Sequence, residues 1–105
     1  MKHREARQDL ADCYRYLERL GLLGTFGHVS MRVPHETDLV FITPVSSGID
    51  GEMRAEDILT ITLDGRQVDG EGRVPPEVPM HTWAHRVRPD AEVVVHSHAL
   101  MATAV

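Results

Sequence analysis

The stretch PPEVPMHTWAHRVRPDAEVVVHSHA, residues 75–99, decides the fold. Apolar and histidine side chains recur at helical spacing after Glu77, which predicts a helix from there to about residue 87, ending before Pro89. The valine run that follows predicts a strand over residues 93–96, with the continuous apolar character of a strand buried on both faces. A helix that leads into a buried strand is typical of a layered α/β domain.

The rest of the sequence predicts one further complete helix, four strands and the start of a last helix. Apolar side chains recur at i, i+3, i+4 and i+7 from Leu10 to Leu20, and the glycines that follow terminate this amphipathic helix. A polar turn joins the first two strands as a hairpin, and Asp64–Gly65 joins the next two. The expected helices cover residues 4–20 and 98–105, and the expected strands cover residues 28–33, 39–43, 59–63 and 66–68.

Composition indicates a globular chain and excludes several classes of protein. The 105 residues, 42% of them apolar, suit one small domain or part of a larger one. The net charge of −5 and the absence of a Lys/Arg block argue against nucleic acid or an anionic membrane as the main partner. Cys13 is the only cysteine, and no segment has the apolar length of a signal peptide or membrane span. We therefore expect a cytoplasmic protein.

His96-Ser97-His98 is the first candidate for chemistry. Residues i and i+2 at a strand end point to the same side, so both imidazoles can close on one metal ion. The spacing alone is weak, because seven histidines placed at random in this length give roughly 0.4 such pairs. The position is more informative, since open α/β sheets bind ligands at the carboxyl ends of their strands.

Glu77, His81 and His85 are further candidates on the predicted helix. Glu77 is either a first-turn acid favoured by the helix dipole or a carboxylate that carries a proton near a metal. His81 and His85 are four residues apart on one face and offer a His-x-x-x-His metal pair. Thr82 stands where a zinc protease would have its glutamate, so that activity is disfavoured. We expect at least one of these histidines to serve packing or hydrogen bonding.

Two loops offer small residues, hydroxyls and backbone N–H groups. They cover Gly24–Ser30 and Thr43–Gly48. Such loops are either anion cradles or plain turns. Neither contains the Gly-Lys-Ser/Thr sequence of a phosphate-binding P-loop.

In chain order, four runs resemble the class II aldolase/adducin family. They are GTFGHVSMRV (24–33), FITPVSSGID (41–50), AEDILTITLDGRQVDG (55–70) and the opening stretch, whose acid before Pro-x-His, Arg-Pro-Asp, valine strand and His-x-His are the most specific part. The resemblance implies a three-layer α/β/α sandwich with a mixed, largely antiparallel central sheet. Because the sequence stops within an element, residues 1–105 are expected to be the N-terminal part of a single such domain, apparently truncated.

The resemblance also implies a function. Members near the family's sugar-phosphate aldolases and epimerases are divalent-metal-dependent carbon–carbon lyases that cleave a small hydroxy-carbonyl substrate through a metal-stabilised enediolate. Zinc is the expected metal, with Mn²⁺, Co²⁺ or Fe²⁺ as alternatives, and the active protein is expected to be a homotetramer. By resemblance, Glu77 is the catalytic acid/base, and His96 and His98 are metal ligands with a third histidine beyond residue 105. The implied substrate-binding residues are Gly27, His28, Ser30, Thr43, Ser46, Ser47 and Gly48.

Three departures from the sugar-phosphate aldolase pattern bear on the substrate. His28 replaces an asparagine, TPVSSG has an apparent insertion, and Pro75-Pro76 replaces two serines. Proline offers neither an N–H nor a hydroxyl to a phosphate, so a phosphate substrate is disfavoured. The alternative is decarboxylation of a hydroxylated aromatic or heteroaromatic carboxylate. A non-catalytic, adducin-like interaction module is the third hypothesis, which the presence of Glu77, His96 and His98 disfavours.

Overall fold

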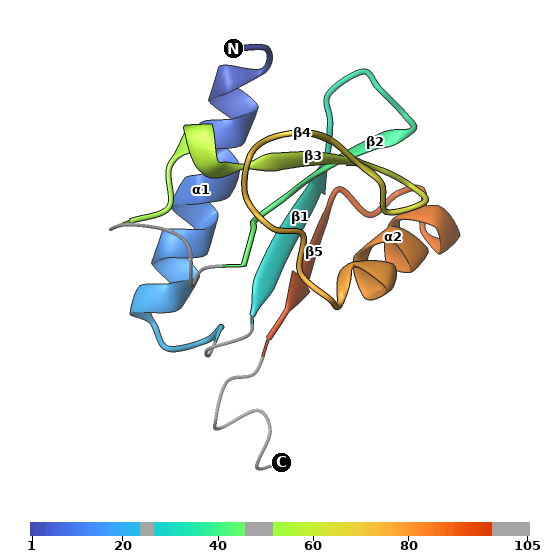
Figure 1. Cartoon of the computed structure of the whole chain (residues 1–105). Helices are drawn as coiled ribbons and strands as arrows, with labels where there is room; N and C mark the ends of the chain where they lie inside the picture. Colours follow the sequence, from blue (N-terminus) through green and yellow to red (C-terminus); the bar gives the residue numbers. More distant parts are fainter. Residues whose placement is uncertain (24–26, 46–51, 98–105) are drawn as a thin grey trace, which may run out of the picture.

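A computed structural model describes residues 1–23, 27–45 and 52–97 of the chain (Figure 1). Both complete helices and all five strands are confirmed, with ends within two residues of those predicted. A short 3₁₀ helix was not predicted, and the expected helix over 98–105 lies outside the described residues. The elements are α1 (Arg4–Arg19), β1 (His28–Arg32), β2 (Leu39–Ile42), η2 (Ala55–Asp57), β3 (Leu59–Thr62), β4 (Gln67–Asp69), α2 (Val78–Val87) and β5 (Val93–His96).

The five strands form one sheet in the order β4-β3-β2-β1-β5. The first four strands are neighbours in sequence and pair as successive hairpins, whereas β5 returns through α2 to pair with β1. The register of β1 with β5 places His28 opposite His96, and the register of β1 with β2 places Ser30 opposite Ile42. Every pairing among the described strands is antiparallel, so this part of the chain contains no parallel component of the expected mixed sheet.

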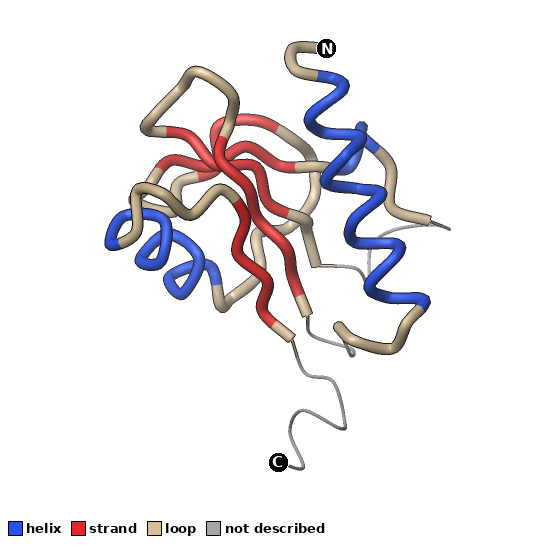
Figure 2. The backbone as a smooth tube through the Cα atoms, turned by 180° about the vertical axis from the view of Figure 1, so that it is seen from behind, coloured by secondary structure: helices blue, strands red, loops and turns tan. Residues whose placement is uncertain are grey.

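The two helices lie on opposite faces of the sheet (Figures 1 and 2). On one face, Leu10 and Tyr14 of α1 pack with Val29 and Phe41. The core of the other face includes Val78 of α2 and four fully buried strand residues, namely Val40, Ile42, Leu59 and Ile61. Burying a side chain of this size contributes roughly 1.5–3 kcal/mol, so both faces contribute to stability.

The prediction that β5 is buried on both faces was wrong. Val93 is 48% exposed and Val95 is 46% exposed, while Val94 and His96 are half-buried. The reason is the position of β5 at the edge of the sheet, where α2 packs against one face and α1 lies over β1 and β2 instead. The valine run therefore has cover on one face only within the described part of the chain.

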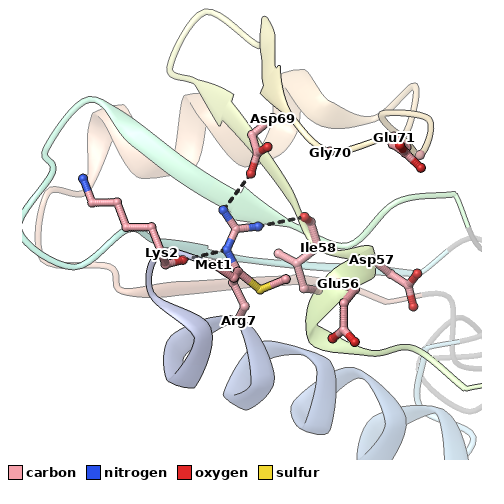
Figure 3. Close-up of a pocket in the computed structure, with 10 residues that line it drawn as sticks. Met1, Lys2, Arg7, Glu56, Asp57, Ile58, Asp69, Gly70 and Glu71 are labelled. Atoms are coloured by element: carbon pink, nitrogen blue, oxygen red, sulfur yellow. Dashed lines mark hydrogen bonds and ion pairs between the residues drawn. The ribbon is translucent and has the colours of Figure 1, made fainter.

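Arg7 joins the N-terminal helix to strands β3 and β4 at one edge of the sheet. It is 7% exposed, and its guanidinium lies 4.6 Å from the ring centroid of Phe41. It donates hydrogen bonds to Lys2 O at 3.0 Å, Ile58 O at 3.1 Å and Asp69 Oδ2 at 2.8 Å (Figure 3). It also donates to Thr60 Oγ1 at 3.2 Å. A pocket of about 630 Å³ lies beside it. Sequence analysis missed this residue, although position 7 falls on the same helix face as Leu10, Ala11 and Tyr14.

A buried polar contact holds α2 against β1. Ser30 Oγ lies 2.7 Å from His81 Nδ1 and 2.9 Å from His85 Nε2, and both imidazoles are almost fully buried. His85 Nδ1 donates to Ala91 O at 3.3 Å. Burial is the main cause that lowers the pKa of His81 to about 4, and burial also lowers the pKa of His85. The expectation that at least one of the two serves hydrogen bonding is confirmed for both.

No helix in the described part of the chain has the length and apolar character needed to cross a bilayer.

Replacement of Arg7 by methionine is expected to lower the free energy of unfolding by about 2–3 kcal/mol. Methionine keeps an apolar stem but leaves the Ile58 carbonyl and the Thr60 hydroxyl without their donor. Arg4→Met is the matched control, because Arg4 is exposed and its ion pair with Glu56 spans 3.7 Å. That variant should change stability by no more than about 0.5 kcal/mol. Urea unfolding measures both, and equal effects would contradict the bridging role of Arg7.

Acid is expected to destabilise the protein between about pH 6.5 and pH 4. The pKa of His81 is about 4 in the folded chain and near 6.5 in the unfolded chain, so the unfolded state takes up a proton in this window and the folded state does not. The free energy of unfolding should therefore fall by about 2–3 kcal/mol as the pH drops through it.

Two variants separate this effect from other histidines. His81→Asn cannot take up the proton and should flatten the dependence of stability on pH. His35→Asn, at an exposed residue with φ of 64° that asparagine also adopts, should leave the dependence unchanged. An unaltered slope in His81→Asn would show that His81 is not the group responsible.

Candidate active site

Three imidazoles from three elements gather where β1, β5 and α2 meet. The ring centroids of His28 and His96 lie 6.0 Å apart with an interplanar angle of 12°, as their opposed positions in the sheet dictate. The His81 ring of α2 lies 6.3 Å from that of His28 and 6.4 Å from that of His96. Sequence analysis singled out all three residues but did not group His81 with the other two.

Glu77 joins this cluster from the start of α2. Its Oε1 accepts a hydrogen bond of 3.0 Å from Nε2–H of His28. The His28 side chain is only 6% exposed and that of Glu77 is 33% exposed, so a buried imidazole holds a carboxylate that solvent still reaches. The hydrogen bond from His28 is the main cause that lowers the pKa of Glu77, with a backbone N–H second. Glu77 makes no capping hydrogen bond with its side chain, which argues against a role as a helix cap.

The described small and hydroxyl-bearing candidates already have structural roles. Gly27 is required for close packing, because a Cβ there would lie 2.4 Å from Leu23 O. Thr43 is fully buried and its Oγ1 accepts the Val29 N–H at 3.1 Å. The Ser30 hydroxyl lies between His81 and His85. Their contacts with a substrate therefore stay predictions.

Four of the sequence-predicted residues lie outside the described part of the chain. They are Ser46, Ser47, Gly48 and His98. The convergence of the loop hydroxyls on one pocket, and of His96 with His98 on one ion, therefore stays a prediction. Of the two prolines expected to form a wall beside them, Pro75 is buried and Pro76 is exposed.

The donors that are present fit one part of a divalent metal site. His96 offers an imidazole, Glu77 offers a carboxylate, and the two are close enough for His96 to help lower the pKa of Glu77. Imidazole and carboxylate are the groups that bind zinc in catalytic sites. The described residues contain no complete set of three His, Cys, Asp or Glu side chains placed to hold an ion. Two of the three expected histidine ligands lie outside those residues.

The sequence spacing of Glu77, His81 and His85 could have indicated that these three residues lie together. Glu77, His81 and His85 recur every four residues and share one face of α2. The side chain of Ser30 lies two residues from His28 on the same face of β1, so the helix face and the strand face meet. The arrangement brings the Glu77 carboxylate and the imidazoles of His28, His81 and His96 to one end of the sheet.

Comparison with known proteins identifies relatives of this chain. Residues 8–105 match the sequence model of the class II aldolase and adducin N-terminal domain. The chain is 40% identical to the L-fuculose phosphate aldolase of Escherichia coli K12, over 99% of this chain and 46% of that protein. It is 35% identical to the 3,4-dihydroxyphthalate decarboxylase of Arthrobacter keyseri, over 93% of this chain and 42% of that protein.

A solved L-fuculose 1-phosphate aldolase has the same fold. It superposes with a TM-score of 0.81 at 31% identity, over 95% of this chain and 47% of that chain. The chain thus spans about half the length of the relatives it matches. The match of the family model over residues 8–105 shows that this chain belongs to the class II aldolase and adducin family.

Proposed function

We propose that the protein is a divalent-metal-dependent carbon–carbon lyase of the aldolase type that cleaves a small hydroxy-carbonyl substrate. One observation carries the proposal, namely the hydrogen bond between His28 and Glu77 beside His96. It gives one site an ionised carboxylate, an imidazole that orients it and a nitrogen ligand for a metal. The L-fuculose phosphate aldolases among the relatives support this chemistry.

In this proposal His96 and His98 hold the metal together with a histidine beyond residue 105. Zinc is the preferred ion, with Mn²⁺, Co²⁺ or Fe²⁺ as alternatives. When bound, the metal supplies positive charge that stabilises the electron pair left on the substrate as the carbon–carbon bond breaks. Glu77 moves the proton: its carboxylate takes the hydrogen of the substrate hydroxyl as the bond breaks and returns it to the carbon of the other fragment.

His28 prepares Glu77 for this role. Its hydrogen bond fixes one carboxylate oxygen and lowers the pKa of Glu77, so the free enzyme holds the carboxylate in the basic form. Because His28 is buried and pairs through β1 with β5, the base is positioned by the sheet. A base on a rigid element keeps its geometry as substrate binds.

We extend the proposal to the whole domain. It is a three-layer α/β/α sandwich with a mixed, largely antiparallel sheet, of which residues 1–105 form the N-terminal part. The opposite placement of α1 and α2 and the half-covered strand β5 support this architecture. The active form is a homotetramer that acts on a small molecule.

A second candidate is decarboxylation of a hydroxylated aromatic or heteroaromatic carboxylate. Two observations favour it. His28, a residue that departs from the sugar-phosphate pattern, contacts Glu77. The 35% identity to a 3,4-dihydroxyphthalate decarboxylase lies within the 29% to 40% found for the L-fuculose phosphate aldolases. The non-catalytic, adducin-like module has less support, because both Glu77 and His96 are present in one cluster.

Glu77→Gln is expected to reduce turnover by at least about 100-fold while metal content stays that of the wild type. Glutamine has the shape of glutamate but cannot take up the proton. Glu71→Gln is the matched control, because Glu71 is an exposed loop residue outside the site, and its turnover should be that of the wild type. Turnover of L-fuculose 1-phosphate and of 3,4-dihydroxyphthalate is measured together with metal content. Full activity in Glu77→Gln would remove Glu77 from the mechanism, and a wild type without stoichiometric divalent metal would refute the lyase proposal.

Competition binding is expected to separate the two candidate reactions. Pro75 and Pro76 lack the donors that serines would give a phosphate, so the metal-loaded protein should bind a hydroxybenzoate-type carboxylate more tightly than dihydroxyacetone phosphate. That result would favour the decarboxylase. Tighter binding of dihydroxyacetone phosphate by an order of magnitude would show that the loop 43–48 supplies the missing donors, and would favour the sugar-phosphate aldolase.

A further inference from the structure

The hydrogen atoms along Ala91, His85, Ser30 and His81 have only one arrangement. The Ala91 carbonyl can only accept, so Nδ1 of His85 carries the hydrogen. Both imidazoles are almost fully buried, which favours their neutral form and leaves Nε2 of His85 without a hydrogen. Nε2 of His85 therefore accepts the hydrogen of the Ser30 hydroxyl over 2.9 Å.

The same reasoning fixes the tautomer of His81. A serine hydroxyl has a single hydrogen, which His85 receives, so Ser30 Oγ must accept from His81 at 2.7 Å. Nδ1 of His81 carries its hydrogen, and Nε2 presents a lone pair. Nε2 is buried, and no group among the described residues donates a hydrogen bond to it. A buried acceptor without a donor is unfavourable, which points to a donor that arrives from elsewhere.

The neighbouring imidazole rings do not supply that donor. The ring centroids of His28 and His96 lie 6.3 Å and 6.4 Å from that of His81, and 6.0 Å from each other. A direct N–H···N bond would bring two ring centres to roughly 5 Å. Neither His28 nor His96 is therefore close enough to donate an N–H directly to Nε2 of His81.

We propose that His81 is a specificity-determining residue whose Nε2 accepts a hydrogen bond from a hydroxyl group of the substrate, bound among His28, His81 and His96. The inference rests on the proposed function and defines its substrate further. A hydroxyl brings the hydrogen that Nε2 lacks, whereas an ionised carboxylate or phosphate oxygen brings none. The site therefore requires a hydroxyl at this position and places the anionic group of the substrate elsewhere.

Two substitutions at residue 81 separate the functions of the two ring nitrogens. The amide of asparagine occupies the place of Nδ1, so His81→Asn keeps a donor to Ser30 and removes the Nε2 acceptor. The amide of glutamine reaches the place of Nε2, so His81→Gln keeps an acceptor there and removes the donor to Ser30. If His81 is only structural, Asn is the tolerated replacement in every assay.

The test uses the whole metal-loaded protein, with 3,4-dihydroxyphthalate and L-fuculose 1-phosphate as probes. For the probe that the wild type binds more tightly, His81→Asn should weaken binding at least about ten-fold with little change in unfolding temperature. His81→Gln should bind within about three-fold of the wild type but unfold at a lower temperature. Binding that follows the opposite order, strong in Asn and lost in Gln, would overturn the proposal.

Imidazole ¹⁵N NMR gives a readout that does not depend on a variant folding. In the wild type, His81 should show a hydrogen on Nδ1 and a bare Nε2, and the Nε2 resonance should shift when the bound probe is added. An Nε2 that carries a hydrogen, or one that the probe leaves unchanged, would overturn the inference while the lyase proposal stands. If the wild type binds and cleaves neither probe, the proposed function fails, and the inference fails with it.

Discussion

The hydroxyl group of Ser30 is the contact on which the site depends. Ser30 lies in β1, the strand that pairs with both β2 and β5. Its hydroxyl group is hydrogen-bonded to two buried imidazoles of α2, those of His81 and His85. These contacts set the height and rotation of the helix over the sheet. Because Glu77 stands at the first turn of that helix, the position of its carboxylate beside His28 follows from the contact between Ser30 and the helix.

Two of the buried polar side chains, Arg7 and His81, differ in how fully their hydrogen-bonding atoms are satisfied. Arg7 is satisfied by four acceptors, so its role is complete within the described structure. The imidazole of His81 has one satisfied nitrogen and one that is not. A buried polar atom without a partner requires an explanation, and the proposed substrate hydroxyl supplies one for Nε2 of His81. The active-site cluster and the bridge through Arg7 are thus distinguished by hydrogen bonding, although both are buried.

Sequence alone predicted the elements because their signals are local. Periodicity, turn residues and prolines lie within each segment, and so α1, α2 and the two hairpins were expected close to where they occur. The valine run of β5 predicts a buried strand but does not show which elements pack against it, so the prediction of two buried faces was wrong. The pairing of His28 with His96 depends on register between distant strands, which no local pattern encodes. The family resemblance supplied Glu77 and His96 as a pair, but not the contact between Glu77 and His28.

The pairing of β1 with β5 also bears on how the protein folds. The other strand pairs join neighbours in sequence, whereas β1 and β5 are separated by almost the whole sheet and by α2. Contacts between distant segments form later because the chain loses more loop entropy in closing them. His28 and His96 meet only in this pair, so the hairpins can assemble before a site exists. A partly folded chain would then contain most of its secondary structure but not the arrangement of His28 and His96 in the candidate site, so the approach of these two rings would report that folding is complete.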